Sequence, residues 1–383
     1  MTDMLGSLYG AVSSSGRRRV AHAPGIHTHA GLVQLADRVH ENRLVVLTTG
    51  DRASHSLVLN WLQMSRRASI TNTIVLCWDT ALFSLLQSRR IASYDDSANL
   101  AAWAQTHIER PLQRIFMERF VAVASLVLAG FDVVHTDADA VFLRDWRPFL
   151  RSLPADTHMF AQRDLYPELM VDAMGGYTAC MGFIFFRSSE LVARFLDDSF
   201  HRAQAHAYRT TALFQYAFNA NWLRWQLREA SSANVSKQKS WSRGAADHNQ
   251  RWAVSVDTDA TINQTTFVQA RLSPWPCGLT ANRSACPTHF RGFCDRRGVD
   301  SDRPCLKLGL LPHNAFVRYA LANASSREQT FLAPNSEALV YHPLTNTGRH
   351  EMKRNALHAL GLFYSSPPAP PGPVRTPDRP ESE

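Results

Sequence analysis

The segment AGFDVVHTDADAVFLRDWRPFL, residues 129–150, decides which fold is predicted for this chain. Val133 and Val134 belong to an apolar run that is typical of a strand in the interior of a sheet. Asp137 and Asp139 follow that run, and because side chains alternate along extended backbone, both carboxylates are expected on the same side. Open α/β sheets bind their ligands at the carboxyl edge, so the segment predicts a binding site there.

Two carboxylates held together are hard oxygen ligands, which suit Mg²⁺ or Mn²⁺ carrying the diphosphate of a nucleotide sugar. Asp-x-Asp also occurs by chance, and Asp257 and Asp259 form a second copy among polar residues, where a solvated turn is the better interpretation. The first copy differs in context, because an apolar helix-like run at 115–129 stops at Gly130 before the strand begins. This context favours a metal-binding role for the first pair.

Strand-like and helix-like segments alternate along much of the chain. Residues 44–48, 74–78 and 182–186 are predicted strands, whereas the apolar faces of 190–205 and 211–227 predict helices. Such alternation predicts an α/β fold in which a mostly parallel sheet is covered by helices on both faces.

Other blocks of sequence accompany the carboxylate pair in a fixed order. They are ENRLVVLTTG at 41–50, LNWLQ at 59–63, ITNTIVLCWD at 70–79, GFIFFRSS at 182–189, FQYAFN at 214–219 and YHPLTNTG at 341–348. Together with the central segment, they resemble the nucleotide-diphospho-sugar transferase family of plants, algae and protists, which includes arabinosyl-, xylosyl- and α-galactosyltransferases. The resemblance implies a single-domain glycosyltransferase-A fold, with a Rossmann-like sheet flanked by helices.

The resemblance also implies roles at the edge of the sheet. It places Thr48, Thr49 and Gly50 at the nucleoside of the donor, with Asp79 as a neighbour, although a turn that requires glycine explains Gly50 equally well. Arg119 stands where the family commonly has a lysine, and it is expected to direct a cation at the sugar or the diphosphate. A surface arginine on an amphipathic helix is the alternative for Arg119.

A histidine and a glycine near the end of the chain match the family's late pattern. His342 is expected to complete the metal site, because two carboxylates with one imidazole suit Mn²⁺. Gly348 matches the family's glycine at the phosphates. The lysine that follows in the family would fall at Met352, so Lys353 is expected to contact the diphosphate only if its helix turns differently.

Two positions depart from the family pattern at the sugar. Cys180 replaces an asparagine, and Phe214 replaces an aspartate and cannot accept a hydrogen bond from a sugar hydroxyl. Gln215 and Asp164 are expected to recognise the sugar, with a loop-capping role as the alternative for Asp164.

The implied activity is metal-dependent transfer of a sugar from a UDP-sugar to a glycan, peptide or glycoprotein acceptor, with retention of anomeric configuration. The departures at the sugar leave a catalytically weak sugar-nucleotide or glycan-binding protein as an alternative. Haloacid-dehalogenase-type phosphatases also place Asp-x-Asp after a buried strand, but their later Gly-Asp-x-x-x-Asp does not follow here. The chain has a net charge of +8. Outside the short 17–19 cluster it contains no basic run interleaved with aromatic residues, so nucleic acid is not a predicted partner.

Both ends of the chain differ in composition from its middle. Residues 1–40 lack sustained apolar periodicity, and the proline-rich tail at 365–383 can neither pack nor form a helix. We therefore expect disordered ends around a catalytic domain at 41–364. No apolar run of about 18 residues occurs, which predicts no membrane segment in this chain.

An irregular insertion is expected at 230–305. Its cysteines are Cys277, Cys286, Cys294 and Cys305, for which disulfides are favoured over a zinc knuckle because no Cys-x-x-Cys pair occurs. Sequons at Asn234, Asn263, Asn282 and Asn323 also favour the secretory pathway. The resemblance implies the Golgi lumen, where members usually follow an amino-terminal anchor, and a truncated amino terminus would reconcile that location with this sequence.

Overall fold

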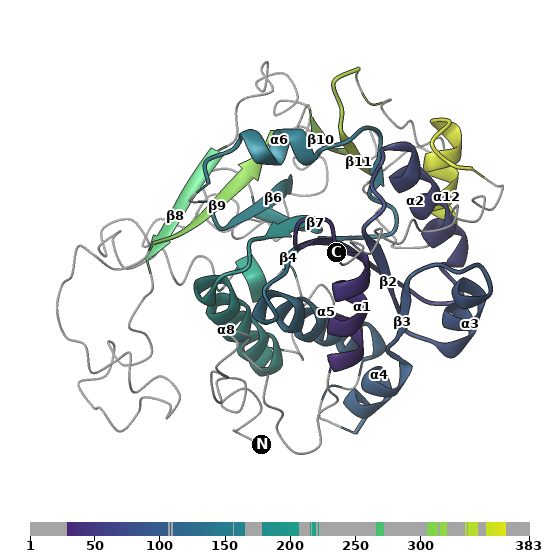
Figure 1. Ribbon diagram of the computed structural model, residues 1–383, viewed down its shortest axis with the longest axis horizontal. Helices are drawn as coiled ribbons and strands as arrows, with labels where there is room; N and C mark the ends of the chain where they lie inside the picture. Colours follow the sequence, from purple (N-terminus) through teal and green to yellow (C-terminus); the bar gives the residue numbers. More distant parts are fainter. Residues whose placement is uncertain are drawn as a thin grey trace, which may run out of the picture.

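The computed structural model describes residues 29–105, 108, 110–155, 157–164, 178–206, 215, 217–219, 221, 266–271, 305–312, 315–319, 334, 336–343 and 350–364. Their main feature is a twisted sheet with helices on both sides (Figure 1). None of the described helices combines the length and the apolar character needed to cross a membrane.

The large sheet contains parallel and antiparallel pairs. Its strands are β1 (Leu44–Gly50), β2 (Thr73–Cys77), β3 (Ser93–Asp95), β4 (Asp132–Thr136), β6 (Met159–Asp164), β7 (Thr178–Phe186), β8 (Thr266–Arg271) and β9 (Cys305–Leu311). They lie in the order β3-β2-β1-β4-β7-β6-β9-β8. The first four strands are parallel, β7 is antiparallel to β4 and β6, β9 is parallel to β6, and β8 is antiparallel to β9. The α/β class, with a mostly parallel sheet, is confirmed.

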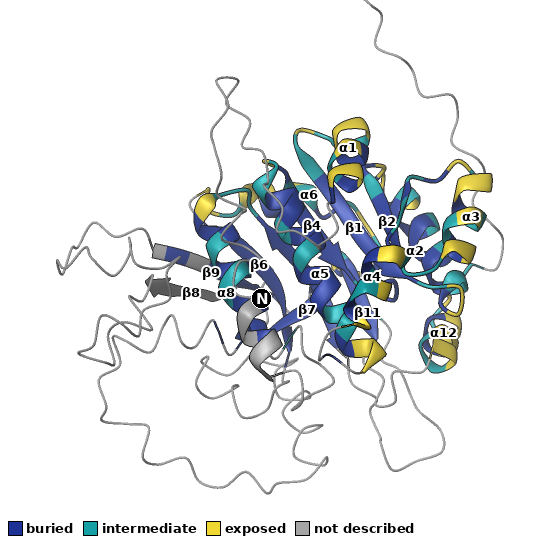
Figure 2. Ribbon diagram, turned by 90° about the horizontal axis from the view of Figure 1, so that it is seen from below, coloured by how far each residue is buried: buried dark blue, intermediate teal, exposed yellow. Residues whose placement is uncertain are grey.

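Alternation along β1 builds a separate core on each face of this sheet. Val45 and Leu47 pack toward one face, whereas Val46, between them, packs toward the other. The first face is covered by α1 (Ala30–Val39), α4 (Ser97–Trp103), α5 (Pro111–Leu128) and α8 (Glu190–His206). The second is covered by α2 (His55–Arg67), α3 (Thr80–Ser88) and α12 (His350–Ala359). Strands are therefore buried, while exposed residues lie on the outer faces of α1, α3 and α12 (Figure 2).

A small second sheet brings distant parts of the chain to the end of β4. It consists of β10 (Phe316–Tyr319), β11 (Val340–Pro343) and β5 (Val141–Phe142), in the order β10-β11-β5. The short helix α6 (Arg147–Ser152) follows β5. Because β5 comes directly after the aspartate pair, its antiparallel pairing with β11 carries His342 to that pair.

Two predictions about which segments are ordered are wrong. The segment 1–40, predicted to be disordered, ends in α1, where Leu32, Leu35 and Ala36 recur at helical spacing and are buried in the same core as α5. The insertion at 230–305, predicted to be irregular, contributes β8 to the sheet, and its last residue begins β9. The tail at 365–383 lies outside the described residues, as do the four sequons and the other three cysteines of the insertion.

Candidate functional site

The aspartate pair lies at the carboxyl edge of the large sheet, immediately after β4. The backbone N–H of Asp137 donates to the carbonyl of Gly182 at 2.9 Å, and the N–H of Ala140 donates back to the carbonyl of Asp137 at 3.0 Å. These bonds form a tight turn between β4 and β5. The turn leaves the side chain of Asp137 25% exposed and that of Asp139 only 3% exposed.

His342 reaches the pair from β11. Its Nε2 lies 3.8 Å from Oδ2 of Asp137 and 3.7 Å from Oδ2 of Asp139, and one ligand atom from each of the three residues lies within 4.8 Å of the others. Two carboxylate oxygens and one imidazole nitrogen form a donor set that fits Mn²⁺ or Mg²⁺, with the imidazole favouring Mn²⁺. The three residues that the sequence proposes for the metal are therefore brought together.

Gly182, on β7, makes room for the imidazole. A Cβ built at this position would lie 2.0 Å from Cε1 of His342, which is too close for any residue other than glycine. The ring therefore rests on the bare backbone of β7. The sequence block GFIFF contains this glycine but does not indicate why it is needed, because the contact joins residues on two different sheets.

The other nitrogen of His342 is held by two buried polar groups. Nδ1 lies 2.7 Å from Nη1 of Arg318 and 3.2 Å from Oε1 of Gln162, whose Nε2 donates to the carbonyls of Phe316 and Val317. Burial and then the charge of Arg318 lower the pKa of His342 well below its usual value, so the imidazole is neutral at neutral pH. Because a guanidinium can only donate, Nδ1 accepts from Arg318 at 2.7 Å in this geometry. Binding of a metal at Nε2 would require Arg318 to move off Nδ1, so that Nδ1–H donates to Gln162.

Arg119, on α5, connects the metal site to the end of β1. Its Nη1 donates to Oδ1 of Asp137 and its Nη2 donates to Oγ1 of Thr49, both at 2.9 Å. The guanidinium also lies 5.3 Å from the ring centroid of Trp78. Burial is the largest single influence and would raise the pKa of Asp137, but Arg119, Lys353 and His342 together lower it below its ordinary value. A surface arginine is therefore the wrong alternative, since the Arg119 side chain is 11% exposed and forms two directed contacts.

Thr48 and Gly50 shape the strand end. Oγ1 of the fully buried Thr48 donates to the carbonyl of Thr136 at 3.0 Å, which ties β1 to β4. A Cβ at Gly50 would lie 2.6 Å from Cγ2 of Val58, so α2 can approach only a glycine there. Both residues hold the edge of the sheet in shape beside Thr49.

Asp79 caps the helix that follows β2. Its Oδ1 accepts from the N–H of Leu82 at 2.6 Å, and its Oδ2 accepts from the N–H of Arg52 at 2.5 Å. One carboxylate therefore joins the loop after β1 to the start of α3. The same edge holds both of these loops next to Thr49.

Lys353, on α12, points at the aspartate pair. Its Nζ lies 2.9 Å from Oδ2 of Asp139. Burial would lower the pKa of Lys353, but Asp139 and then Asp137 raise it, so the ammonium is charged. The helix thus presents Lys353, one position after the Met352 that the family pattern indicates. Gly348 lies outside the described residues.

A second polar group lies behind His342. Asp164 ends β6 and is fully buried, and its Oδ2 lies 3.0 Å from Nε of Arg318 and accepts from Nε2 of Gln215 at 2.9 Å. Asp164 is therefore joined to Arg318 and Gln215, and its role at the sugar stays a prediction. Arg318 was not indicated by the sequence, because only the pairing of β10 with β11 places it opposite His342.

Cys180 occupies the position of the family's asparagine, on β7. Its Sγ lies 3.8 Å from Nδ1 of His342 and accepts from the N–H of Gly182 at 3.3 Å. Burial raises the pKa of the Cys180 thiol to about 12, so it is a neutral, weakly polar neighbour of the imidazole. Phe214, the other departure, lies outside the described residues.

Comparison with known proteins agrees with this geometry. A model of the nucleotide-diphospho-sugar transferase family matches residues 68–268, which is more than half of the chain. The chain belongs to this family. Membership favours a nucleotide-sugar site over the phosphatase alternative, because the matched residues include the aspartate pair.

Individual relatives of this nucleotide-diphospho-sugar transferase are distant. It is 20% identical to arabinosyltransferase XEG113 of Arabidopsis thaliana over 138 residues, which are 36% of this chain and 21% of that protein. Mouse xyloside xylosyltransferase 1 is 11% identical, with 47% of this chain and 82% of that chain covered and a TM-score of 0.35. The galactosyltransferase LgtC, solved with donor and acceptor sugar analogues, is 12% identical, with 46% and 69% covered and a TM-score of 0.32.

Proposed function

We propose that this chain is a metal-dependent retaining glycosyltransferase that moves a sugar from a UDP-sugar to a glycan, peptide or glycoprotein acceptor. The observation that carries the proposal is the convergence of Asp137, Asp139 and His342 at the carboxyl edge of the sheet. Mn²⁺, or Mg²⁺ in its place, is the proposed cofactor. When bound, the ion supplies positive charge to the diphosphate that leaves the sugar.

The cations around the aspartate pair support this proposal. Arg119 and Lys353 approach it from α5 and α12, and each already pairs with one of the two carboxylates. Loss of UDP places negative charge on the departing phosphate, and preorganised cations stabilise that charge most effectively in a site with little water. We assign Arg119 and Lys353 to the diphosphate, and Thr49, beside Arg119, to the nucleoside.

The polar group behind His342 is proposed to receive the sugar. Gln215 has its amide on Asp164, and Arg318 pairs with the same carboxylate, so Gln215 and Asp164 form one connected unit next to the metal site. In this unit Asp164 is already engaged by a guanidinium. We assign Gln215 to a sugar hydroxyl, with Asp164 orienting its amide.

Retention of configuration is supported by what the site offers the reaction. The family's carboxylate before Gln215 is Phe214 here, so that position supplies no nucleophile. The acceptor hydroxyl is proposed to approach on the face from which UDP departs, with the departing phosphate taking its proton. The lumen of the Golgi, or of another secretory compartment, is the proposed location.

Release of UDP in the absence of an acceptor tests the proposal. Purified protein is incubated with Mn²⁺ and UDP-arabinose, UDP-xylose or UDP-galactose, and UDP is quantified. We expect slow hydrolysis of one donor, which Asp139→Asn abolishes. Asp37→Asn is the matched control, since Asp37 pairs only with the surface residue Arg43 among the described residues, and it should retain the activity.

The opposite outcome is equally defined. Binding of Mn²⁺ and UDP without release from any donor, even with glycan or peptide acceptors added, would overturn the proposal. That result would support the alternative of a sugar-nucleotide-binding protein, which Cys180 and the ion pair between Asp164 and Arg318 favour.

A further inference from the structure

A second group of metal-ligating side chains includes Glu118, which directly precedes Arg119 in α5. His29 precedes α1, Asp96 follows β3, and Glu118 lies in α5; they are 3%, 0% and 2% exposed. One ligand atom from each lies within 4.8 Å of the others. We propose that His29, Asp96 and Glu118 bind a structural divalent transition-metal ion, with Zn²⁺ as the best fit.

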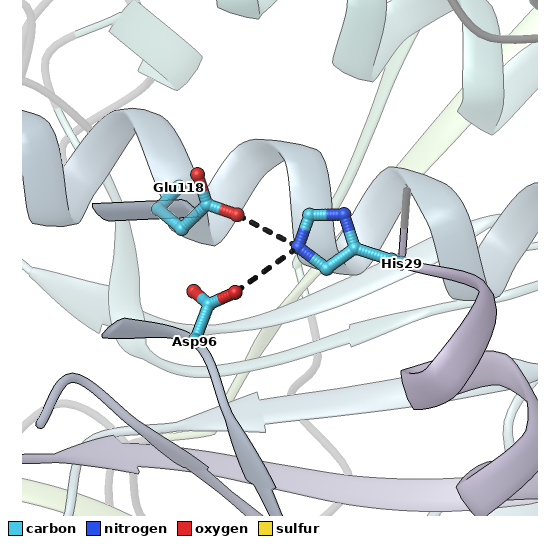
Figure 3. A group of neighbouring side chains, drawn as sticks. All are labelled: His29, Asp96 and Glu118. Atoms are coloured by element: carbon cyan, nitrogen blue, oxygen red, sulfur yellow. Dashed lines mark ion pairs between the residues drawn. The ribbon is translucent and has the colours of Figure 1, made fainter. Parts of the chain in front are cut away.

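The three side chains converge on one point (Figure 3). Nε2 of His29 lies 2.7 Å from Oε1 of Glu118 and 3.6 Å from Oδ1 of Asp96. Zinc bonds of about 2.0–2.2 Å put neighbouring ligand atoms in a tetrahedron about 3.3–3.6 Å apart. The contact with Asp96 already has this spacing, and the contact with Glu118 needs to widen by less than about 1 Å.

Buried donors hold the two carboxylates in place. Nε1 of Trp103 donates to Oε2 of Glu118 at 2.5 Å, and Nδ2 of Asn99 donates to Oδ1 of Asp96 at 2.7 Å. These donors leave Oδ2 of Asp96 and Oε1 of Glu118 buried without an aligned hydrogen-bond donor among the described residues. Metal-binding carboxylates are commonly oriented in this way by a second layer of donors. A bound ion would satisfy Oε1 of Glu118, and on Asp96 it would be held by Oδ1, which also accepts from Asn99, or by the remaining Oδ2.

The charges of the group also call for a second positive charge. Among the described residues, neither carboxylate forms an ion pair with a lysine or an arginine, so one imidazolium faces two carboxylates. A divalent ion with a neutral imidazole would balance both carboxylates.

The position of the group indicates what the ion would do. It would join the start of α1, the turn between β3 and α4, and the middle of α5. Glu118 is followed by Arg119, whose side chain reaches Asp137. An ion on Glu118 would therefore hold the helix turn that presents Arg119 to the proposed donor site.

Metal binding is tested in the full chain carrying Asp137→Ala and Asp139→Ala, so that the proposed catalytic site cannot contribute. After removal of metal with a chelator, Zn²⁺ or Co²⁺ is added. We expect one equivalent of Zn²⁺ by elemental analysis, the visible spectrum of tetrahedral Co²⁺, and a rise in Tm of about 2–4 °C with Zn²⁺. Absence of binding and of the Tm shift would overturn the proposal and leave an ionic link between His29 and Glu118.

Substitutions within the group locate the ion. Glu118→Gln should remove the Co²⁺ spectrum, whereas Glu190→Gln, at an exposed carboxylate that starts α8, should retain it. Asn99→Ala removes the donor to Asp96 and a hydrogen bond with Tyr94 but no ligand, so it offers a second test if Glu118→Gln does not fold. We expect it to weaken Zn²⁺ binding about 10-fold or more. Unchanged affinity in these variants would overturn the assignment. The proposed transferase activity plays no part in any of these measurements.

Discussion

Nζ of Lys353 lies 2.9 Å from Oδ2 of Asp139, so the proposed metal ligand already has a cation beside it. A divalent ion on Asp139 and the ammonium of Lys353 must share or compete for the same carboxylate. In this pair the ammonium of Lys353 is held beside Asp139. Once a metal ion has taken its place on Asp139, the ammonium would be free to pair with a phosphate of the donor. We therefore expect Lys353 to link metal binding to diphosphate binding.

Lys353→Met should separate these two effects. Removing the competing ammonium should raise the affinity for Mn²⁺ measured without nucleotide, by about 10-fold, which corresponds to about 1.4 kcal/mol. The same change should weaken UDP binding in the presence of Mn²⁺, because one cation at the diphosphate is lost. Titration calorimetry measures both affinities. If Lys353→Met and Lys353→Arg bind Mn²⁺ and UDP like the wild type, the link is wrong.

Gly182→Ala should displace His342 from the aspartate pair. The new Cβ would lie 2.0 Å from Cε1 of the imidazole. Because Arg318 and Gln162 contact the ring at Nδ1, the imidazole can relieve this overlap only by moving away from the aspartate pair. We expect the affinity for Mn²⁺ to fall by about 10-fold or more, as for other disturbed metal sites. Gly361→Asn is the control, because Gly361 has a φ of +66° that asparagine tolerates and no atom within 4 Å of its Cβ position. Equal Mn²⁺ affinity in both variants would contradict the packing argument.

His135 should make the protein less stable as the pH falls. It is fully buried beside β7, and burial followed by the charge of Arg119 lowers its pKa from 6.5 to about 3. The folded state therefore binds fewer protons than the unfolded state between these two values. The stability that His135 contributes is present above pH 6.5 and is lost as the pH falls toward 3, by up to about 1.4 kcal/mol per pH unit.

Urea unfolding of wild-type protein and His135→Gln at pH 7 and pH 5 measures this effect. The variant should lose less stability between the two pH values than the wild type does. A loss of the same size in both proteins would show that other groups account for the acid sensitivity. His29→Gln is a useful comparison, because the raised pKa of His29 acts in the opposite direction, stabilising the protein at low pH.

Arg318 and Asp164 should behave as a buried ion pair. Arg318→Met leaves a fully buried carboxylate with its main cation removed, which typically costs about 3–5 kcal/mol of stability. Asp164→Asn leaves the guanidinium in the same position. The double variant should be more stable than the sum of the two single losses predicts, which urea unfolding in a double-mutant cycle measures. Additive losses would mean that the two residues contribute separately.

Local sequence patterns predicted most of the elements near the site. The apolar runs at β1, β2, β4 and β7 and the periodic face of α8 depend on neighbours in the chain, so the sequence displays them directly. The prediction that residues 1–40 are disordered missed α1. Its three buried residues identify a helix only when the core that they pack against is known. The predicted irregular insertion likewise missed β8, whose partner strand lies more than thirty residues later.

The sequence by itself determined the family of the chain and the position of the aspartate pair, because a buried strand and two carboxylates two residues apart are local features. Only the tertiary structure decided what surrounds that pair. The sheet of β5, β11 and β10 brings His342 and Arg318 together, and α12 brings Lys353 to Asp139. These contacts join residues far apart in the chain, and they depend on burial and on closely paired charges that no single segment contains. The group around His29 was decided in the same way, by three elements that meet on one face of the sheet.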